Sequence, residues 1–292
     1  MSGESKPLKA PNSVNELKRR ITRISGAQPI VRVQNLVGDI VVGQMMPSGA
    51  IKGGVAIKLR VGDATSRFTT DLDAARRGTL EEFIDQFQDR LISGWEGFAG
   101  IVQVRPPAQP ADVPSHYVMQ PFAVKLTYKG KSFRTVDFEL GHDELEAAAD
   151  PEYMIDESSR QMFADLGLAD PQPIPLLPLS YQIAQKLHAC TAPGRNERAH
   201  DLVDLQILER AAHLDLVAIR AIALRLFPYR STHTWPPTVD MHNGWDTIYD
   251  SAADGLNVFS DIGTAIQWAN DLIAQIDDAD GSTIHETGED GT

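Results

Sequence analysis

Residues 50–74 read AIKGGVAIKLRVGDATSRFTTDLDA, and this stretch decides the fold. Its first three residues favour a short strand that ends at two adjacent glycines, Gly53 and Gly54. The apolar spacing after them predicts a helix over 55–61, which Gly62 ends. Residues 69–74 then alternate between polar and apolar side chains, as a half-buried strand does. The order of strand, glycine pair, helix and strand indicates an α/β lobe.

Two carboxylates stand on the second of these strands. Asp71 and Asp73 are two positions apart, so they point to the same face of the strand. Such a pair suits Mg²⁺, which takes oxygen ligands and substrate phosphates, with Mn²⁺ as the alternative metal. The glycine pair Gly53-Gly54 lets backbone N–H groups approach a phosphate, and Arg67 is placed to assist with triphosphate charge. Taken alone, the two acids also fit a solvated strand face.

A second acidic strand is predicted over 133–140. Asp137 and Glu139 share one of its faces. If this strand pairs near the strand of Asp71, Glu139 can act as a third metal ligand. The alternative is a half-buried strand with a polar outer face, and the sequence leaves open which of the two acids coordinates a metal.

Helices and strands alternate through the rest of the N-terminal part. Ser13 and Glu16 form a capping box that starts a helix, and Pro29 suits the first turn of a second one. Lys129-Gly130-Lys131 is the turn of a hairpin. Further elements are predicted as a helix over 80–92 and strands over 101–104, 122–128 and 133–140.

The composition changes after residue 142. Residues 143–178 are acidic and then rich in proline, which favours a linker. Beyond it the pattern is helical, over 180–192, 197–213, 216–227, 245–253 and 261–277. The predicted organisation is an α/β lobe over 1–142, the linker over 143–178, a helical lobe over 179–277 and a disordered acidic tail over 278–292.

The helical lobe contributes a third set of polar residues. Lys186 lies on the first of its helices, and His200 and Asp204, four positions apart, share a face of the next. Lys186 is placed to hold a triphosphate or to activate an attacking hydroxyl; the alternative is a structural salt bridge between Lys186 and an aspartate of the other helix. His188 and His200 lack the spacing of metal ligands, so we expect capping or hydrogen-bonding roles for them.

Charge and composition exclude several classes of protein. The chain has 292 residues, a net charge of −13 and one cysteine, which excludes an internal disulfide. Residues 1–70 hold 11 Lys and Arg against 4 Asp and Glu, a net charge of +7, so the remainder carries −20. The overall acidity argues against non-specific duplex binding but allows a local basic face for a phosphate ligand. With neither a targeting segment nor a membrane span recognisable, we expect a cytoplasmic protein without a membrane partner.

Five segments in order resemble the AbiEii/AbiGii nucleotidyltransferase toxins of the polymerase-β-like superfamily, and most closely their mycobacterial-type, tRNA-modifying members. The family pattern combines a glycine pair, an R-x-S/T-x-D-x-D strand, a later acidic strand, a K-L-H-A helix and an R-x-x-D-L-x-D-L helix. The matching residues are Gly53-Gly54, Arg67 to Asp73, Glu139, Lys186 to Ala189, and Arg198 to Leu205. The resemblance implies a lobe with a mixed sheet, a helical lobe after it and a central cleft between the two.

The resemblance also implies roles for individual residues. Asp71 and Asp73 would bind Mg²⁺, and Glu139 would be the third acid, which helps activate the attacking hydroxyl. Lys186 and Asp204 would complete the catalytic set from the helical lobe. The residues implied to line the nucleotide are Gly53, Gly54, Arg67, Thr69 and Lys186.

By resemblance, the activity is transfer of a nucleoside monophosphate, often a pyrimidine, from an NTP to the 3′ acceptor end of tRNA, which blocks translation. A cognate antitoxin is implied, in some pairs one that phosphorylates a Ser or Thr beside the catalytic aspartates, here Thr69. Two alternatives remain open: transfer to a protein or small-molecule acceptor, and a non-catalytic protein that binds NTP or the antitoxin.

Overall fold

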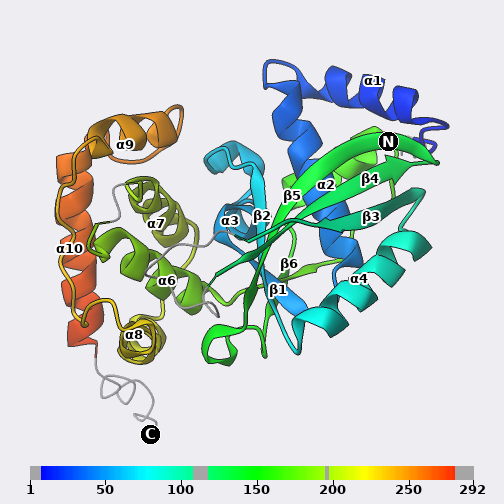
Figure 1. Ribbon diagram of the computed structural model, residues 1–292. Helices are drawn as coiled ribbons and strands as arrows, with labels where there is room; N and C mark the ends of the chain where they lie inside the picture. The colour runs from blue at the N-terminus through cyan, green and yellow to red at the C-terminus, as the bar shows by residue number, and fades with distance from the viewer. Residues whose placement is uncertain (1–7, 108–117, 195–196, 280–292) are drawn as a thin grey trace, which may run out of the picture. The chain divides into compact units, whose positions relative to one another are not determined.

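The chain folds as two compact units, Met1–Pro178 and Leu179–Thr292. The structure is a computed structural model that describes residues 8–107, 118–194 and 197–279 (Figure 1). The predicted acidic tail lies outside the described residues from residue 280 onward. The predicted combination of a mixed α/β sheet with helices after it is confirmed.

A mixed sheet forms the centre of the first unit. Within the described residues it has seven strands, in the order β3-β4-β5-β2-β1-β7-β6. β2 runs parallel to β5 and β1 runs parallel to β7, whereas the other neighbours are antiparallel. The strands are β1 Gly49–Lys52, β2 Asp71–Arg76, β3 Phe98–Val104, β4 Gln120–Tyr128, β5 Lys131–His142, β6 Glu152–Met154 and β7 Ile174–Leu176.

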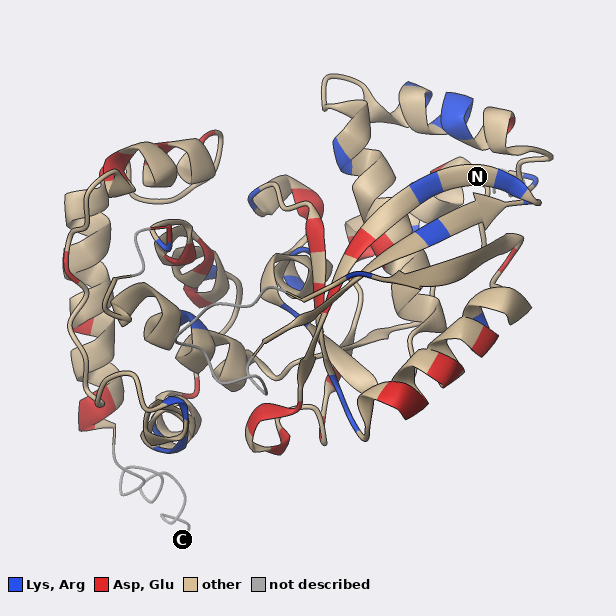
Figure 2. Ribbon diagram, in the orientation of Figure 1, with Lys and Arg blue, Asp and Glu red and all other residues tan. Residues whose placement is uncertain are grey.

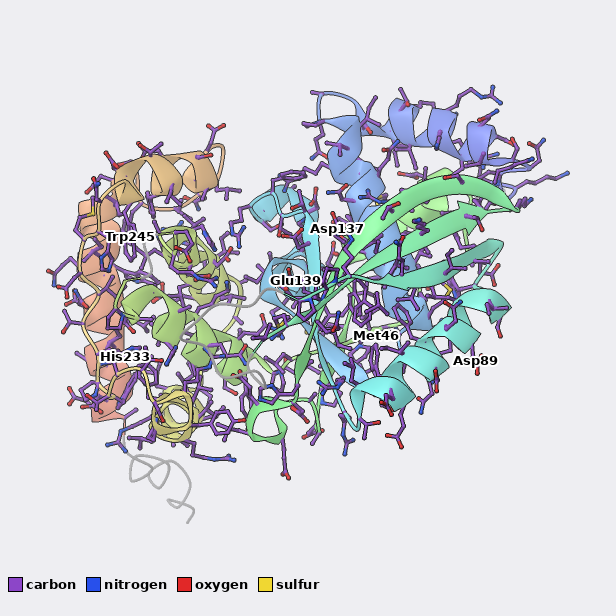
Figure 3. All side chains as sticks on the ribbon, viewed as in Figure 1. Met46, Asp89, Asp137, Glu139, His233 and Trp245 are labelled. Atoms are coloured by element: carbon purple, nitrogen blue, oxygen red, sulfur yellow. The ribbon has the colours of Figure 1, made fainter. Side chains whose placement is uncertain are left out.

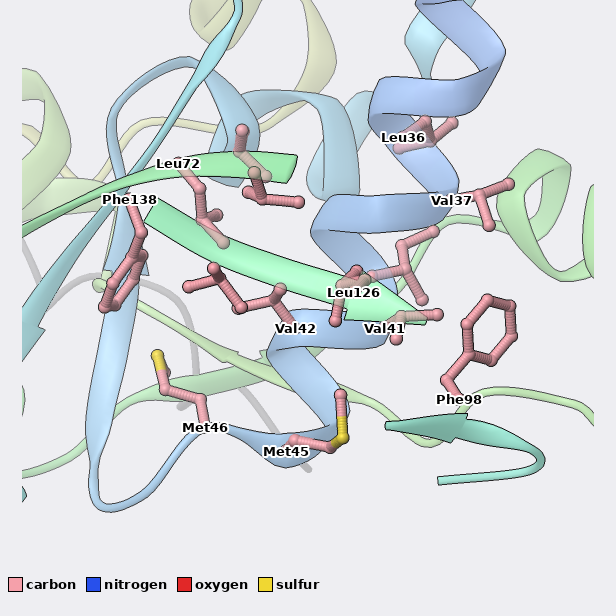
Figure 4. Packing of buried hydrophobic residues seen from close by; sticks show 14 of the residues in the cluster. Leu36, Val37, Val41, Val42, Met45, Met46, Leu72, Phe98, Leu126 and Phe138 are labelled. Carbon is pink, nitrogen blue, oxygen red and sulfur yellow. The ribbon is translucent and has the colours of Figure 1, made fainter. Parts of the chain in front are cut away.

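Helices of the first unit bury their apolar sides against one face of this sheet. Val41 and Met45 of α2 pack in the same buried cluster as Leu72 of β2 and Phe138 of β5 (Figure 4). Phe138 also lies 5.5 Å, centroid to centroid, from the ring of Phe87 on α4. The helices of this unit are α1 Val14–Ser25, α2 Ile30–Met45, α3 Gly53–Val61, α4 Leu80–Ser93 and α5 Glu157–Leu166.

Local sequence signals fix the ends of these helices. Ser13 caps α1 by accepting a hydrogen bond from the Glu16 amide, while the Glu16 carboxylate accepts from the Asn12 amide rather than from Ser13. Thr79 and Glu82 form a full capping box at α4. α3 begins at Gly53, two residues before the predicted start, so the glycine pair belongs to its first turn.

The segment over 143–178 differs from the predicted linker. It forms α5, β6 and β7, and β7 pairs with β1 in the central sheet. Ile174 and Leu176 are buried, with Phe163 of α5, in the same cluster as the rest of the unit. Short strands interrupted by proline lack a long alternating pattern, which is why composition alone suggested a linker.

The second unit is helical. Trp245 and Tyr249 of α9 are fully buried, and the Tyr249 hydroxyl accepts a hydrogen bond from Gln206 of α7 at 3.0 Å. Its helices are α6 Leu179–Thr191, α7 His200–Ala211, α8 Leu216–Arg230, α9 Trp245–Ala253 and α10 Ile262–Asp278. In the described part of the chain, every helix is too short or too polar to cross a membrane.

Candidate active site

The parallel pairing of β2 with β5 gathers four carboxylates on one face of the sheet. Asp71 pairs in register with Asp137, and Asp73 pairs with Glu139. Their neighbours Leu72 and Phe138 are fully buried on the opposite face, so alternation turns the acids away from the core. We call Asp71, Asp73, Asp137 and Glu139 the acidic face. From the sequence, Glu139 can be a metal ligand only if its strand pairs near that of Asp71. The structure has this pairing, between β2 and β5.

The two acids of β5 have different surroundings, and both are labelled in Figure 3. The guanidinium of Arg105, just after β3, lies 2.7 Å from Asp137 Oδ1. Both side chains are about half exposed, at 45% and 51%, so this ion pair adds little stability. It does compete for the Asp137 carboxylate. Glu139, in register with Asp73, is therefore the better candidate for a third metal ligand.

Glycine is required at positions 53 and 54 because the side chains of Asp73 and Thr69 lie against them. Gly53 has φ +65°, and a Cβ there would collide with the carboxylate of Asp73. A Cβ on Gly54 would lie 3.0 Å from Cγ2 of Thr69. The N-terminus of α3, Asp73 and Thr69 thus lie together, and free amides at a helix N-terminus favour a phosphate. Arg67, also predicted to line the nucleotide, donates a hydrogen bond to the Phe68 carbonyl of its own loop at 3.5 Å.

Lys52 also belongs to this region, and the sequence alone did not predict a role for it. The antiparallel pairing of β1 with β2 places it in register with Asp73, so it extends the row of Asp73 and Glu139 across the sheet. Its Nζ lies 3.5 Å from Sδ of Met119 and 3.1 Å from the point where Gly141 would carry a Cβ. The available signal was its place directly before Gly53, at the end of a strand.

Metal binding is tested by the chemistry and the placement of these donors. Carboxylate oxygens on one face are the ligands that Mg²⁺ and Mn²⁺ prefer, so the donor set fits a hard divalent cation. Among residues 8–107, 118–194 and 197–279, however, no three His, Cys, Asp or Glu side chains converge closely enough to hold a metal ion. Asp71, Asp73 and Glu139 are thus neighbours on the sheet whose side chains do not yet enclose an ion.

The second unit holds the other predicted residues in a buried cluster of charges. Lys186 Nζ lies 2.8 Å from Asp201 Oδ1 and 2.6 Å from Asp204 Oδ2. The residues are 8%, 3% and 1% exposed, so water screens the pairs weakly. The salt bridge that was the alternative reading of Lys186 is therefore present, with Asp201 as an additional member. Asp201 lies in the same motif, Arg198 to Leu205, from which the sequence predicts a catalytic role for Asp204 alone.

His188 and His200 each contact neighbouring side chains of the second unit. His188 Nδ1 lies 3.4 Å from an Arg230 guanidinium nitrogen, and its ring is 4.9 Å from that of Phe227. His200 Nε2 lies 3.7 Å from Asp201 Oδ1, beside the charge cluster. Cys190 is buried and lies against the Leu187 carbonyl at 3.5 Å, with burial raising the pKa of its thiol. These contacts are structural.

Comparison with known proteins identifies the class to which this site belongs. A family described as "Nucleotidyl transferase AbiEii toxin, Type IV TA system" matches residues 36–276, most of the chain. The chain therefore belongs to the AbiEii family of nucleotidyltransferase toxins, and its activity is nucleotidyl transfer. An NTP substrate, a divalent metal in general and a cognate antitoxin follow from the family.

A solved structure shows the same fold. MenT4, a nucleotidyltransferase toxin of Mycobacterium tuberculosis H37Rv, superposes with a TM-score of 0.57 at 17% identity, over 92% of this chain and 91% of that one. JHP933 of Helicobacter pylori gives a TM-score of 0.41 at 16% identity, over 82% of this chain and 88% of its own. No curated protein matches the sequence.

Proposed function

We propose that the protein is the toxin of a toxin–antitoxin pair that moves a pyrimidine nucleoside monophosphate from an NTP to the 3′ acceptor end of tRNA, with loss of pyrophosphate. The observation that carries this proposal is that the acidic face lies directly beside the glycine pair. Asp73 is in register with Glu139 and lies against Gly53, so candidate metal ligands and a candidate phosphate cradle adjoin. Nucleotidyl transfer needs these two features together.

Each residue of the first unit has a role in this proposal. Asp71, Asp73 and Glu139 would hold Mg²⁺ or Mn²⁺, which when bound would neutralise phosphate charge and favour in-line displacement at the α-phosphate. Glu139 also helps activate the attacking 3′-hydroxyl. The amides at the start of α3 and the hydroxyl of Thr69 line the triphosphate, and Arg67, in the same loop as Thr69, assists with its charge.

The charge cluster of the second unit serves the same reaction in this proposal. Lys186 stabilises triphosphate charge, and Asp204 orients Lys186 through the 2.6 Å contact between them. Asp201, at 2.8 Å, has the same effect on the ammonium. Two carboxylates around one ammonium fix its position before a substrate binds, which is the preorganisation that catalysis requires.

A basic surface on the first unit supports RNA as the acceptor. α1 carries Arg19 and Arg23, both exposed, beside a hollow of about 320 Å³ that they line with Arg20, Glu16 and Leu8. Lys125 on β4, Lys129 in the β4–β5 turn and Lys131 at the start of β5 are also exposed, and Figure 2 shows blue segments on α1 and on this hairpin. We call the exposed cations of α1, Arg19 and Arg23, the basic face. It provides local positive charge for phosphates although the whole chain carries −13.

Thr69 is the site we propose for control by the antitoxin. Its side chain is half-buried against Gly54, in the region assigned to the triphosphate. A phosphoryl group on its hydroxyl would occupy that region and place negative charge beside Asp73. Phosphorylation there would therefore exclude NTP.

The test incubates the purified protein with Mg²⁺, total tRNA and each α-labelled NTP separately, with Asp71→Ala alongside. We expect label in tRNA with CTP or UTP and none with the variant. Label that migrates with protein or with a small molecule would replace tRNA by another acceptor. An Asp71→Ala protein with full activity would contradict the assigned site.

A further inference from the structure

Two cationic side chains, from α2 and α3, contact the loop that carries Arg67 and Thr69. Arg32 of α2 contacts Asp63 Oδ2 at 2.5 Å and donates a hydrogen bond to the Ser66 carbonyl at 2.6 Å. Lys58 of α3 donates a hydrogen bond to the Thr69 carbonyl at 3.2 Å. Arg32 therefore holds the start of the loop, and Lys58 holds its end, two residues before Asp71.

Lys58 is a costly residue in its position. Its side chain is 0% exposed, and the burial lowers the pKa of its ammonium. Its Nζ lies 3.9 Å from Asp63 Oδ1 and 5.6 Å from the centre of the Phe68 ring. An apolar side chain of equal length would fill the same space without a desolvation cost. The ammonium therefore calls for an explanation beyond packing.

Asp39 supplies the opposite charge from α2. It is 1% exposed, and within the described residues neither carboxylate oxygen has a hydrogen-bond partner. Lys58 is the strongest charge that acts on it, followed by Arg134. A buried acid without hydrogen bonds costs folding free energy. The chain thus maintains two buried ionisable side chains, and the Lys58 ammonium directs a hydrogen bond to the Thr69 carbonyl at the end of the loop.

We propose that Lys58 is a positioning residue for nucleotidyl transfer, whose buried ammonium, balanced by Asp39 and Asp63, holds the Thr69 carbonyl and so fixes the approach of the chain to Asp71. The inference rests on the proposed function of the acidic face. Lys58 takes no part in the chemistry. It keeps Thr69 packed on Gly54 and sets the direction in which β2 presents its first aspartate.

The test compares two variants in which Asp39 is replaced by asparagine and which differ in whether they keep the Lys58 ammonium. Asp39→Asn keeps the Lys58 ammonium, whereas Lys58→Met with Asp39→Asn removes it, leaves no unbalanced Asp39 and keeps the apolar volume. Arg60→Met is the matched control, because Arg60 lies on the same helix, is 7% exposed and bonds to Glu152 and the Leu177 carbonyl, away from the loop. For each protein we would measure kcat, KM for NTP, the Mg²⁺ concentration for half activity and the thermal melt.

We expect the double variant to lose kcat by about 10- to 100-fold relative to Asp39→Asn and to need more Mg²⁺, because a displaced loop misplaces Asp71. KM for NTP should change less than kcat, and Arg60→Met should keep kcat within about two-fold. Equal kcat in the double variant and Asp39→Asn would overturn the proposal. An equal loss in Arg60→Met would also overturn it, since the effect would then be one of general stability.

A second measurement keeps this test separate from that of the function. Amide hydrogen exchange of residues 67–71, followed by mass spectrometry without NTP or tRNA, should be faster in the double variant than in Asp39→Asn or Arg60→Met. Unchanged exchange overturns the positioning role even if tRNA is labelled. Faster exchange in a protein that labels no acceptor would retain the role of Lys58 and reject the proposed reaction. If the Lys58→Met double variant does not fold, Lys58→Gln with Asp39→Asn takes its place. The glutamine side chain is one atom too short to reach the Thr69 carbonyl, and the same outcomes decide.

Discussion

Asp71 and Asp204 belong to charged clusters with opposite environments. Asp71 is exposed on a sheet face among other acids, and its neighbour in register, Asp137, is half exposed. Asp204 is 1% exposed and lies 2.6 Å from a lysine ammonium. The first cluster leaves negative charge in water, where it costs little, and the second neutralises its charge inside the protein.

This difference separates function from stability. Carboxylates that face water can lose their charge without harm to the fold, so their value lies in what they bind. Carboxylates that share a buried ammonium are tied to the fold, and the loss of one partner leaves the others unbalanced. The same type of substitution should therefore have different consequences in the two units.

The largest effect is expected at the acidic face. Asp71→Asn should lower transfer by about 1000-fold, which corresponds to about 4 kcal/mol in the activation barrier. The free energy of unfolding should change by less than about 0.5 kcal/mol, because Asp71 is exposed. Radiolabel transfer and urea unfolding measure the two quantities. Asp137→Asn is the control, since it lies on the same face but pairs with Arg105, and an equal loss there would make Asp137 the third ligand.

The next effect is expected in the buried cluster. Lys186→Met should lower the free energy of unfolding by about 3 kcal/mol, because two buried carboxylates lose their counter-charge. Urea unfolding of the intact chain, followed by helical circular dichroism, measures it. Adding Asp201→Asn and Asp204→Asn should restore much of the stability but not the activity. If Lys186→Met unfolds like the wild type, the cluster is not tied to the fold.

A smaller effect is expected from Asp39 as the pH changes. Burial raises its pKa from 3.8 to about 7, with Lys58, Arg134, Asp63 and Asp71 as the charges that act on it. Between these two values the unfolded chain has released the proton while the folded protein retains it. Folded-state stability from this group therefore falls as pH rises, by at most about 1.4 kcal/mol per pH unit, and levels off above about pH 7.

Urea unfolding at several pH values measures this slope. Asp39→Asn should remove it and be relatively more stable at pH 8 than at pH 4. An identical pH profile in the variant would show that Asp39 ionises normally in the folded protein.

The smallest effect is expected on the basic face. Arg19→Ala with Arg23→Ala should raise KM for tRNA by about three- to ten-fold and reduce its salt dependence, while KM for NTP stays constant. Thr22→Ala, an exposed neutral position on the same helix, is the control. If KM for NTP rises with that for tRNA, the arginines act on the nucleotide site instead.

The elements that the sequence predicted well are those with a complete local signal. Alternation over β2 and β5 predicted the faces of Asp71 and Glu139. The glycine pair predicted the end of β1, although α3 begins at Gly53 rather than at residue 55. The helices of the second unit follow from apolar spacing, and their bounds differ from prediction by a few residues. The resemblance to the AbiEii family, confirmed by its match over residues 36–276, rests on the same short segments.

What the sequence did not predict depends on contacts between distant segments. β7 has three residues and a proline, and only its pairing with β1 makes it a strand. The position of Lys52 beside Asp73 depends on the register of β1, and the ion pair of Arg105 with Asp137 depends on that of β3, β4 and β5. Asp39 and Lys58 are buried on two different helices and influence each other electrostatically, and no local pattern relates them.

The late strand β7 has a consequence for how the chain is made. β1, which leads into Gly53, has β7 as one of its two neighbours, and β7 ends at Leu176. A ribosome must therefore synthesise more than half of the 292 residues before that edge of β1 can be covered. A fragment that ends at residue 142 would leave this edge open to other strands, which favours aggregation. A nascent toxin should in the same way remain incomplete until well after its aspartates have left the ribosome.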